Sequence, residues 1–330
     1  MQYDLPLEQA REYRSPAALP EDLEAFWHAT LDGDGEPPIF TPVRSGLVAV
    51  DTFDVTFAGY DGAPVKAWLH LPAAPLRSAP LPGVVQYQGY NGGRGLAHEH
   101  VFWATAGYAH LVVDTRGQGS GWTTGVTSDP AGSPPSQPGF LTRGIEDPRT
   151  YYYRRVYTDA VRALEVLRGH ELVDGARVSV AGISQGGGVS LAVAALARSS
   201  VAAVLCDVPF LCDFRRAAAL AQAEPYLELV RYLKAHRDRV ESTFATLAYF
   251  DAAVLARSAA APALFSVALM DVICPPTTVF AAYNAYGGPK DIEVYEFNDH
   301  EGGEAFQRNL QLAWLEKALL HPRHEPAPSP

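Results

Sequence analysis

Two stretches near the start of the chain alternate hydrophobic and polar residues. They cover 47–57 and 65–71, and the turn sequence Gly-Tyr-Asp-Gly stands between them at 59–62. A period of two predicts half-buried β-strands, and an Asp-Gly pair between such strands favours a tight turn. The pattern therefore predicts an antiparallel hairpin.

From residue 83 onward, short apolar runs alternate with helical segments. The runs predict buried strands because they are rich in aliphatic residues and are bounded by turn residues. They cover 83–87, 109–114, 178–182, 202–206, 263–270 and 292–297, and a helix is expected over 310–320. Strands alternating with helices predict a mostly parallel central sheet of the α/β class, with the hairpin as its antiparallel start.

No linker divides the chain, so a single domain over residues 1–330 is expected. The alternating region is preceded by an N-terminal extension at 1–45, in which 20–31 has helical spacing. A Pro-rich tail at 322–330 follows, and we expect it to be flexible.

One long insertion, at 119–150, is rich in Gly, Pro, Ser and Thr. Segments of this length without regular structure are uncommon unless they are functional or disordered. The insertion ends at Asp147 and Pro148, a pair that favours the start of a helix. That helix is expected to stop at Gly169.

Residues 182–186 read Gly-Ile-Ser-Gln-Gly. An apolar, β-branched run precedes them, and an Ala- and Leu-rich helical run follows. A serine on such a strand-to-helix corner, with glycine two residues to either side, is the nucleophile elbow of an α/β-hydrolase fold. Ser184 is therefore the candidate nucleophile.

A serine hydroxyl needs a base to activate it, and the base needs an acid to orient it. In this fold the chain order is Ser, acid, His. Asp271 follows the predicted strand at 263–270, and His300 follows the one at 292–297. Because the carboxyl ends of parallel strands meet at one edge, both side chains are expected there.

Two other acids compete with Asp271. Asp299 is adjacent to His300 and would reach its ring with difficulty, while Asp251 precedes a helix as an N-cap does. Asp271 could itself be a helix cap.

Two backbone N–H groups are candidates for binding the oxyanion. Gln185 opens the helix after the serine, where the first N–H groups have no helical acceptor. Tyr90 lies in a glycine-rich loop after the strand at 83–87, where this fold has its second donor. An ordinary glycine-rich turn is the alternative for that loop.

The composition limits the kinds of partner. A net charge of −11 argues against nucleic acid or an anionic membrane. No window reaches about 18 uninterrupted apolar residues, and no basic-then-apolar signal opens the chain, so neither a membrane span nor secretion is expected. Three widely spaced cysteines fit buried thiols in a reduced, cytoplasmic protein.

Two cofactor patterns fail. The glycines at 89–95 follow a strand, but they lack the G-x-G-x-x-G spacing of a dinucleotide site. The run His98-Glu99-His100 could bind a metal, but the sequence places no third ligand near this run, so a metal site is not expected there. No metal and no organic cofactor are therefore expected.

Three motifs occur in a specific order. Residues 114–122 read Asp-Thr-Arg-Gly-Gln-Gly-Ser-Gly-Trp, residues 182–187 read Gly-Ile-Ser-Gln-Gly-Gly, and Glu301 follows His300. With matching stretches along nearly the whole chain, they resemble the signatures of the acetyl xylan esterase and cephalosporin-C deacetylase family, carbohydrate esterase family 7.

The resemblance implies an esterase that removes acetyl groups from small acetylated sugars and from cephalosporins, through an acetyl-enzyme. It implies a triad of Ser184, Asp271 and His300, and an oxyanion hole formed by the amides of Tyr90 and Gln185.

Phe210 and Ile273 match positions that line a small acyl pocket, to which Tyr90 also contributes. Asp213 stands where the family pattern more often has histidine. The family assembles as a hexamer around an internal cavity, and the insertion at 119–150 matches its interface. Burial in that interface would cover three apolar side chains, Trp122, Phe140 and Leu141.

The signature residues Arg116, Gly117, Gln118 and Glu301 are not part of the triad. A guanidinium at the end of a core strand could anchor the His300 loop through Glu301, and an unrelated structural ion pair is the alternative.

Two other functions stay open. A serine peptidase of the prolyl-oligopeptidase kind shares the triad order, but usually carries a propeller domain that does not fit this chain. The second is an inert hydrolase-like binding protein, which the complete triad disfavours.

Overall fold

A single mixed sheet runs through the described residues of this computed structural model, which are 3–33, 35–78, 80–130 and 136–320. The strand order is β1-β2-β3-β5-β4-β6-β7-β8-β9. Pairings from β1 through β3 to β5 are antiparallel, and those from β5 onward are parallel. The strands are β1 (Ile39–Val43), β2 (Val50–Ala58), β3 (Pro64–Pro72), β4 (Leu81–Tyr87), β5 (Ala109–Val113), β6 (Val173–Ile183), β7 (Val204–Asp207), β8 (Ala263–Ala268) and β9 (Lys290–Tyr295).

The predicted hairpin is confirmed as β2 and β3. Asp61 and Gly62 in its turn have φ of 54° and 69°, and Asp and Gly tolerate this left-handed conformation best. The six later strands also lie where the apolar runs predicted them, although β6 begins five residues earlier.

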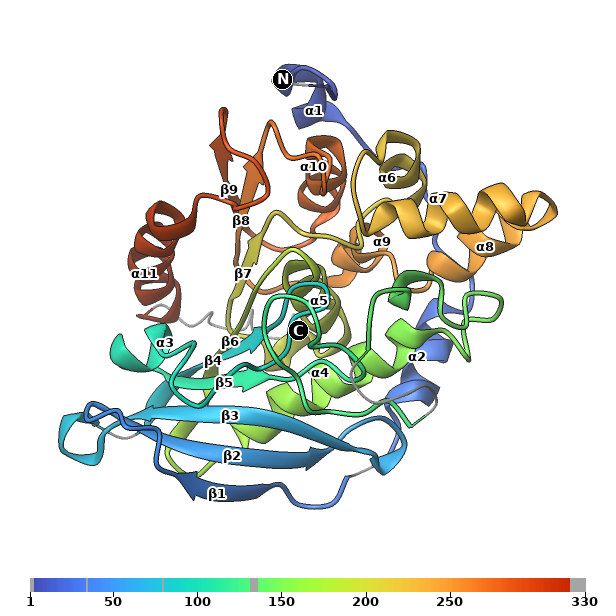
Figure 1. Cartoon of the computed structure of the whole chain (residues 1–330). Coiled ribbons are helices and arrows are strands. Elements are labelled where there is room, and N and C mark those ends of the chain that lie inside the picture. Colours follow the sequence, from blue (N-terminus) through green and yellow to red (C-terminus); the bar gives the residue numbers. More distant parts are fainter. Residues whose placement is uncertain (1–2, 34, 79, 131–135, 321–330) are drawn as a thin grey trace, which may run out of the picture.

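Helices cover both faces of the parallel strands (Figure 1). On one face, α3 and α11 pack through Trp103 and Leu315 against Val84 and Leu205. On the other, α4 and α5 lie in a larger apolar core. The helices are α1 (Leu7–Glu12), α2 (Leu23–Leu31), α3 (Phe102–Thr105), α4 (Tyr152–Arg168), α5 (Gln185–Leu196), α6 (Phe214–Leu220), α7 (Tyr226–Ala235), α8 (Val240–Leu247), α9 (Ala252–Leu255), α10 (Pro276–Ala285) and α11 (Glu304–Leu320).

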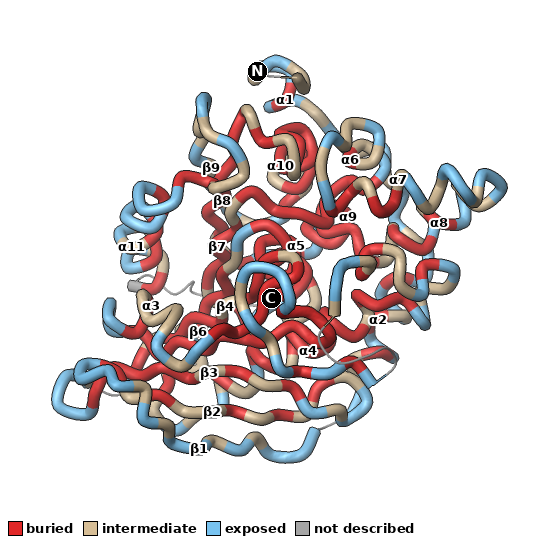
Figure 2. The backbone as a smooth tube through the Cα atoms, viewed as in Figure 1, coloured by how far each residue is buried: buried red, intermediate tan, exposed pale blue. Residues whose placement is uncertain are grey.

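Strand β1 was not predicted from the sequence. It is an edge strand that pairs only with β2, and much of it is exposed (Figure 2). Pro42 lies inside it, which only an edge strand tolerates. The segment was missed because Pro42 interrupts it and it lacks an alternating buried face, although its other four residues are strand formers.

Two predicted helix starts are wrong. Helix α4 begins at Tyr152, because Asp147 instead closes a turn: its side chain accepts from the Arg149 N–H at 2.7 Å and its carbonyl from the Tyr151 N–H at 3.0 Å. The predicted end at Gly169 is confirmed. Helix α11 begins at Glu304 rather than 310.

The described parts of the insertion, 119–130 and 136–150, are mostly irregular and include one short 3-10 turn at Phe140–Thr142. Phe140 and Leu141 are completely buried within their own chain, so no subunit interface is needed to cover them. That part of the argument for an interface is wrong. Trp122 is 56% exposed.

The predicted tail at 322–330 lies outside the described residues. All three cysteines are buried and unpaired. No helix in the described ranges is both long and apolar enough to cross a bilayer.

Candidate active site

Ser184 lies on the corner between β6 and α5. Strand β6 ends at Ile183 and helix α5 starts at Gln185, so one residue makes the turn. Its backbone has φ 57° and ψ −120°, a conformation that residues other than glycine rarely adopt. The corner holds the serine at the carboxyl edge of the parallel strands, as the sequence predicted.

Gly182 and Gly186 flank the serine, and neither position has room for a side chain. A Cβ atom on Gly186 would lie 2.2 Å from the carbonyl oxygen of Tyr87, and one on Gly182 would lie 2.2 Å from the carbonyl carbon of Gly186. Backbone atoms cannot move aside as a flexible side chain can. The two glycines therefore allow α5 to start directly against β4 and β6.

Asp271 and His300 are hydrogen-bonded through the imidazole. The Nδ1 of His300 lies 2.8 Å from Oδ2 of Asp271. The other carboxylate oxygen accepts from the N–H groups of Ile273 and Cys274, at 2.8 and 2.9 Å. Asp271 thus closes a turn and orients the ring at the same time, which leaves Nε2 of His300 available to accept a proton.

The competing acids have other partners. Asp299 accepts from the backbone N–H of His300 at 2.9 Å, not from the ring. Asp251 is the N-cap of α9 and accepts from the Ala253 N–H. Of the three acids, Asp271 is the one bonded to the imidazole.

The Ser184 hydroxyl lies within hydrogen-bonding reach of the Cys274 thiol. That thiol is in turn within 4.8 Å of a ring nitrogen of His300. Among the described residues, no hydrogen bond joins the Ser184 hydroxyl to His300. Catalytic hydrogen bonds are often formed only when substrate is bound.

Both candidate oxyanion donors are free. No described residue accepts a hydrogen bond from the N–H of Tyr90 or from that of Gln185. Their two loops are in contact, since Nε2 of Gln185 donates to the carbonyl of Gln88 at 3.2 Å. Two unpartnered N–H groups next to a serine can stabilise a developing oxyanion.

A family model described as acetyl xylan esterase (AXE1) matches residues 1–318. The chain belongs to the acetyl xylan esterase family. The resemblance inferred from the three motifs is thereby confirmed, and the class of activity is that of an ester hydrolase.

Solved structures agree with this assignment. The acetyl xylan esterase of Paenibacillus sp. R4 is 36% identical with a TM-score of 0.86, covering 95% of this chain and 99% of that one. Acetyl xylan esterase 1 of Thermoanaerobacterium sp. JW/SL YS485 is 31% identical with a TM-score of 0.84, covering 96% and 99%. These likenesses confirm the α/β-hydrolase fold.

A curated relative, acetyl esterase Axe7A of Xylanibacter ruminicola, is 27% identical over 322 residues. The match covers 91% of this chain and 67% of the relative. Membership in this family favours an esterase over a peptidase or an inert binding protein.

Of the two alternatives for Arg116, the contact with Glu301 is wrong and the structural ion pair is confirmed. Arg116 is 1% exposed and forms two hydrogen bonds to Asp159, at 2.5 and 2.6 Å. Glu301 instead accepts from Nδ2 of Asn298 at 2.5 Å and from the Asp299 N–H at 3.0 Å. A buried guanidinium needs a buried acid, and Asp159 on α4 supplies it.

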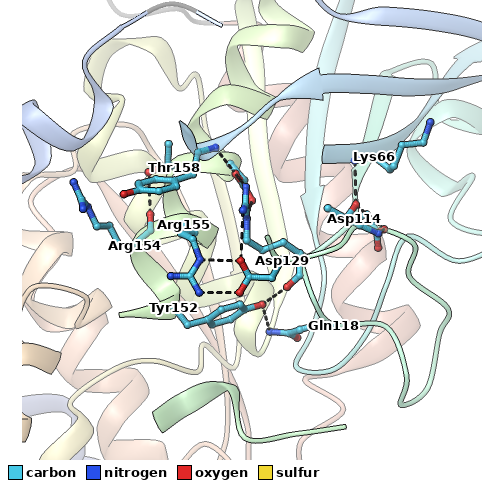
Figure 3. Close-up of polar contacts among 12 residues, drawn as sticks. Lys66, Asp114, Gln118, Asp129, Tyr152, Arg154, Arg155 and Thr158 are labelled. Atoms are coloured by element: carbon cyan, nitrogen blue, oxygen red, sulfur yellow. Dashed lines mark hydrogen bonds and ion pairs between the residues drawn. The ribbon is translucent and has the colours of Figure 1, made fainter. Parts of the chain in front are cut away.

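A second acid of the same ionic cluster, Asp129, belongs to the insertion. It accepts two hydrogen bonds from Arg155, at 2.9 and 2.8 Å (Figure 3). Arg116 lies 3.7 Å from it and Arg143 lies 3.8 Å away. The insertion is therefore attached to α4 through charges inside the protein.

The remaining signature residue, Gly117, has φ 70° and its N–H donates to the carbonyl of Thr127 at 2.8 Å. It makes the turn after β5 and joins that turn to the insertion. Its position is structural.

Phe210 and Ile273 both border the triad. The N–H of Phe210 donates to the carbonyl of Ser184 at 2.9 Å, and its buried ring packs edge-on against Tyr90. Ile273 is half-buried and lies two residues after Asp271. Their role in lining an acyl pocket stays a prediction, since Phe210 is completely buried.

Asp213 is buried, caps α6, and accepts a hydrogen bond from the Tyr13 hydroxyl at 2.9 Å. It therefore contacts the N-terminal extension.

A cavity of about 800 Å³ borders the site on the side of α3 and α11. Gly89, Ile183 and Glu301 are among its lining residues, as is the exposed indole of Trp122. The Nε1–H of Trp122 donates to the carbonyl of Tyr90 at 3.0 Å, so this side chain packs on the loop that carries a candidate oxyanion donor.

Sequence analysis missed Glu228, which holds the other side of that loop. The Tyr90 hydroxyl donates to Oε1 of Glu228 at 2.7 Å, and the Leu141 N–H donates to Oε2 at 3.2 Å. Burial raises the pKa of the Glu228 carboxyl. Nothing in the sequence distinguishes Glu228 from the other glutamates of the chain, because its partners are remote in the sequence.

Proposed function

We propose that this protein is a serine esterase that removes acetyl groups from small acetylated sugars, including xylo-oligosaccharides, and from cephalosporin C. The observation that carries the proposal is the Asp271–His300 hydrogen bond beside a serine on a strained strand-to-helix corner. The chain's membership in the acetyl xylan esterase family supports acetyl as the acyl group.

In the proposed first half-reaction, Oγ of Ser184 attacks the acetyl carbonyl carbon while Nε2 of His300 takes the hydroxyl proton. The carbonyl oxygen becomes an oxyanion, which the amides of Tyr90 and Gln185 bind. The tetrahedral intermediate then expels the sugar oxygen, which receives the proton from His300. Asp271 holds the ring and stabilises the imidazolium.

In the second half-reaction, water attacks the acetyl group on Ser184. His300 accepts a proton from the water and returns it to the serine oxygen, so that acetate leaves and the free enzyme is restored. No external reductant, oxidant or cofactor enters either step.

Acetate release separates this proposal from the alternatives. Acetylated xylo-oligosaccharides and cephalosporin C should release acetate, while peptide amides should not be cleaved. Cleavage of peptides without hydrolysis of acetyl esters would support the peptidase, and no turnover of either would support the inert binding protein.

Phe210 and Ile273 are proposed to close the acyl pocket just beyond a methyl group. Overfilling a rigid pocket costs about 1–3 kcal/mol, so acetate esters should be cleaved much faster than hexanoates. A rate that rises from acetate to hexanoate would contradict this role.

A hexamer remains our proposal for the assembly, together with a cytoplasmic location. Exposed apolar side chains in the insertion, Trp122 and Val126, support a contact surface there. Light scattering should give a mass several times 35.6 kDa, with polymeric xylan a poorer substrate than oligomers. A fully active monomer would rule the hexamer out.

A further inference from the structure

Gln118 is a completely buried side chain whose carboxamide uses all of its hydrogen-bonding capacity. Its Oε1 accepts from the backbone N–H of Asn91 at 2.6 Å and from Nε2 of Gln185 at 3.2 Å. Its Nε2 donates to Oε1 of Gln185 at 2.9 Å and to the Tyr152 hydroxyl at 3.1 Å. A partner lies within reach of each donor and acceptor position.

These partners belong to the two segments that carry the candidate oxyanion donors. Asn91 directly follows Tyr90, and Gln185 carries the second donor on its own backbone. A single side chain from the turn after β5 thus bridges the loop after β4 and the start of α5. The two N–H groups cannot join the segments themselves, because both are donors and both must stay free for the oxyanion.

The side chain of Gln118 and the turn that carries it are held in place by contacts with α4. The Tyr152 hydroxyl, which accepts from Gln118, donates to the carbonyl of Arg116 (Figure 3). The side chain of Arg116 is held by Asp159. The turn that presents Gln118 is therefore anchored to α4 by buried charges.

We infer that Gln118 is a positioning residue that sets the separation of the Tyr90 and Gln185 amides. This inference rests on the proposed esterase function. Oxyanion donors act only when they lie within about 2.7–3.1 Å of the developing charge, and a tolerance of about 0.5 Å governs such sites. A fully satisfied buried network can provide that rigidity.

Gln118→Ala in the full-length protein tests this role with p-nitrophenyl acetate and its thiono analogue, in which sulfur replaces the carbonyl oxygen. Loss of alignment should lower kcat for the ester by about 10- to 100-fold, with little change in KM, because the interaction develops only in the transition state. The thionoester, whose sulfur accepts hydrogen bonds poorly, should lose much less. The ratio of ester to thionoester rates should therefore fall.

Gln311→Ala is the matched control, because Gln311 is also buried and its Nε2 donates to Asp207 at 2.7 Å. It should lower stability without changing the substrate ratio. Gln118→Glu has nearly the same shape and keeps the acceptor for Asn91, so it replaces the alanine variant if that one does not fold. Its ratio should also fall, but less.

An equal loss on both substrates, or an unchanged kcat on the ester, would overturn the positioning role of Gln118. Failure of the proposed function looks different, because the wild-type protein would then not hydrolyse the acetate ester at all.

Discussion

The carboxylate of Asp271 lies 2.8 Å from Nδ1 of His300, while its second oxygen accepts two backbone N–H groups. The carboxylate is completely buried and is held on both sides. The imidazole therefore has a fixed orientation and a fixed tautomer before substrate binds.

Asp271→Asn should lower kcat by about 10⁴-fold, because an amide would favour the wrong tautomer of His300. Steady-state kinetics on p-nitrophenyl acetate would measure the loss. Asp299→Asn is the matched control, since Asp299 touches only the backbone of His300, and should stay within a few-fold of wild type. The reverse result would transfer the role to Asp299.

Gly186→Ala should destabilise the protein by roughly 3 kcal/mol or prevent folding, because the new Cβ would lie 2.2 Å from a backbone oxygen. Gly169→Ala is a suitable comparison, since its Cβ would lie no closer than 3.4 Å to any atom. That change should be neutral or stabilise by up to about 1 kcal/mol. Urea unfolding would measure both, and equal stabilities would show that the elbow has more room than the structure gives it.

Arg116→Ala should cost about 3–5 kcal/mol of unfolding free energy, because Asp159 would be left buried without its partner. In double-mutant cycles, Arg116 and Asp159 should be strongly coupled. Arg116 and Glu301, which have no contact, should be additive within about 0.5 kcal/mol. Strong coupling between Arg116 and Glu301 would contradict the structure and would support an anchoring of the His300 loop by Arg116.

Asp251 should make stability depend on pH. Burial, followed by the charge of Asp213, raises the pKa of its carboxyl to about 7. The folded state therefore binds a proton more tightly than the unfolded state, whose pKa is about 3.9. This group's contribution to stability is fully present below the unfolded value and is lost as pH rises toward 7.

Asp251→Asn removes that titration. The difference in unfolding free energy between wild type and Asp251→Asn should favour wild type more at pH 5 than at pH 8. Chemical unfolding at the two pH values gives the comparison. A difference that does not change with pH would mean that Asp251 titrates normally.

Much of the fold could be predicted because its signals are local. The hairpin alternates with a period of two, and the later strands are continuous apolar runs. The start of α11 gave no such signal, because its first turns bury the polar side chains of Gln307 and Gln311 while Phe306 is 82% exposed and Leu310 is 43% exposed, so no apolar stripe marks them. The start of α4 was missed because Asp147 also closes turns.

In the candidate site, too, the residues with local sequence signals could be predicted and the long-range contacts could not. Ser184, Asp271 and His300 each follow a recognisable strand, so their shared edge could be predicted. The partner of Arg116 could not, because Asp159 lies 43 residues away on α4, a helix that buries polar and apolar side chains alike. The contacts of Glu228 and Gln118 also join segments that only the folded chain brings together.

The most direct test of the account is to trap the acyl group on the nucleophile. Wild-type protein mixed with p-nitrophenyl acetate and quenched with acid should carry one acetyl group on the peptide that contains Ser184, as measured by mass spectrometry. Ser184→Ala should carry none there, and its kcat should fall by about 10⁴-fold or more. Full turnover by Ser184→Ala, or acetyl transfer to another residue in the wild type, would contradict the central claim.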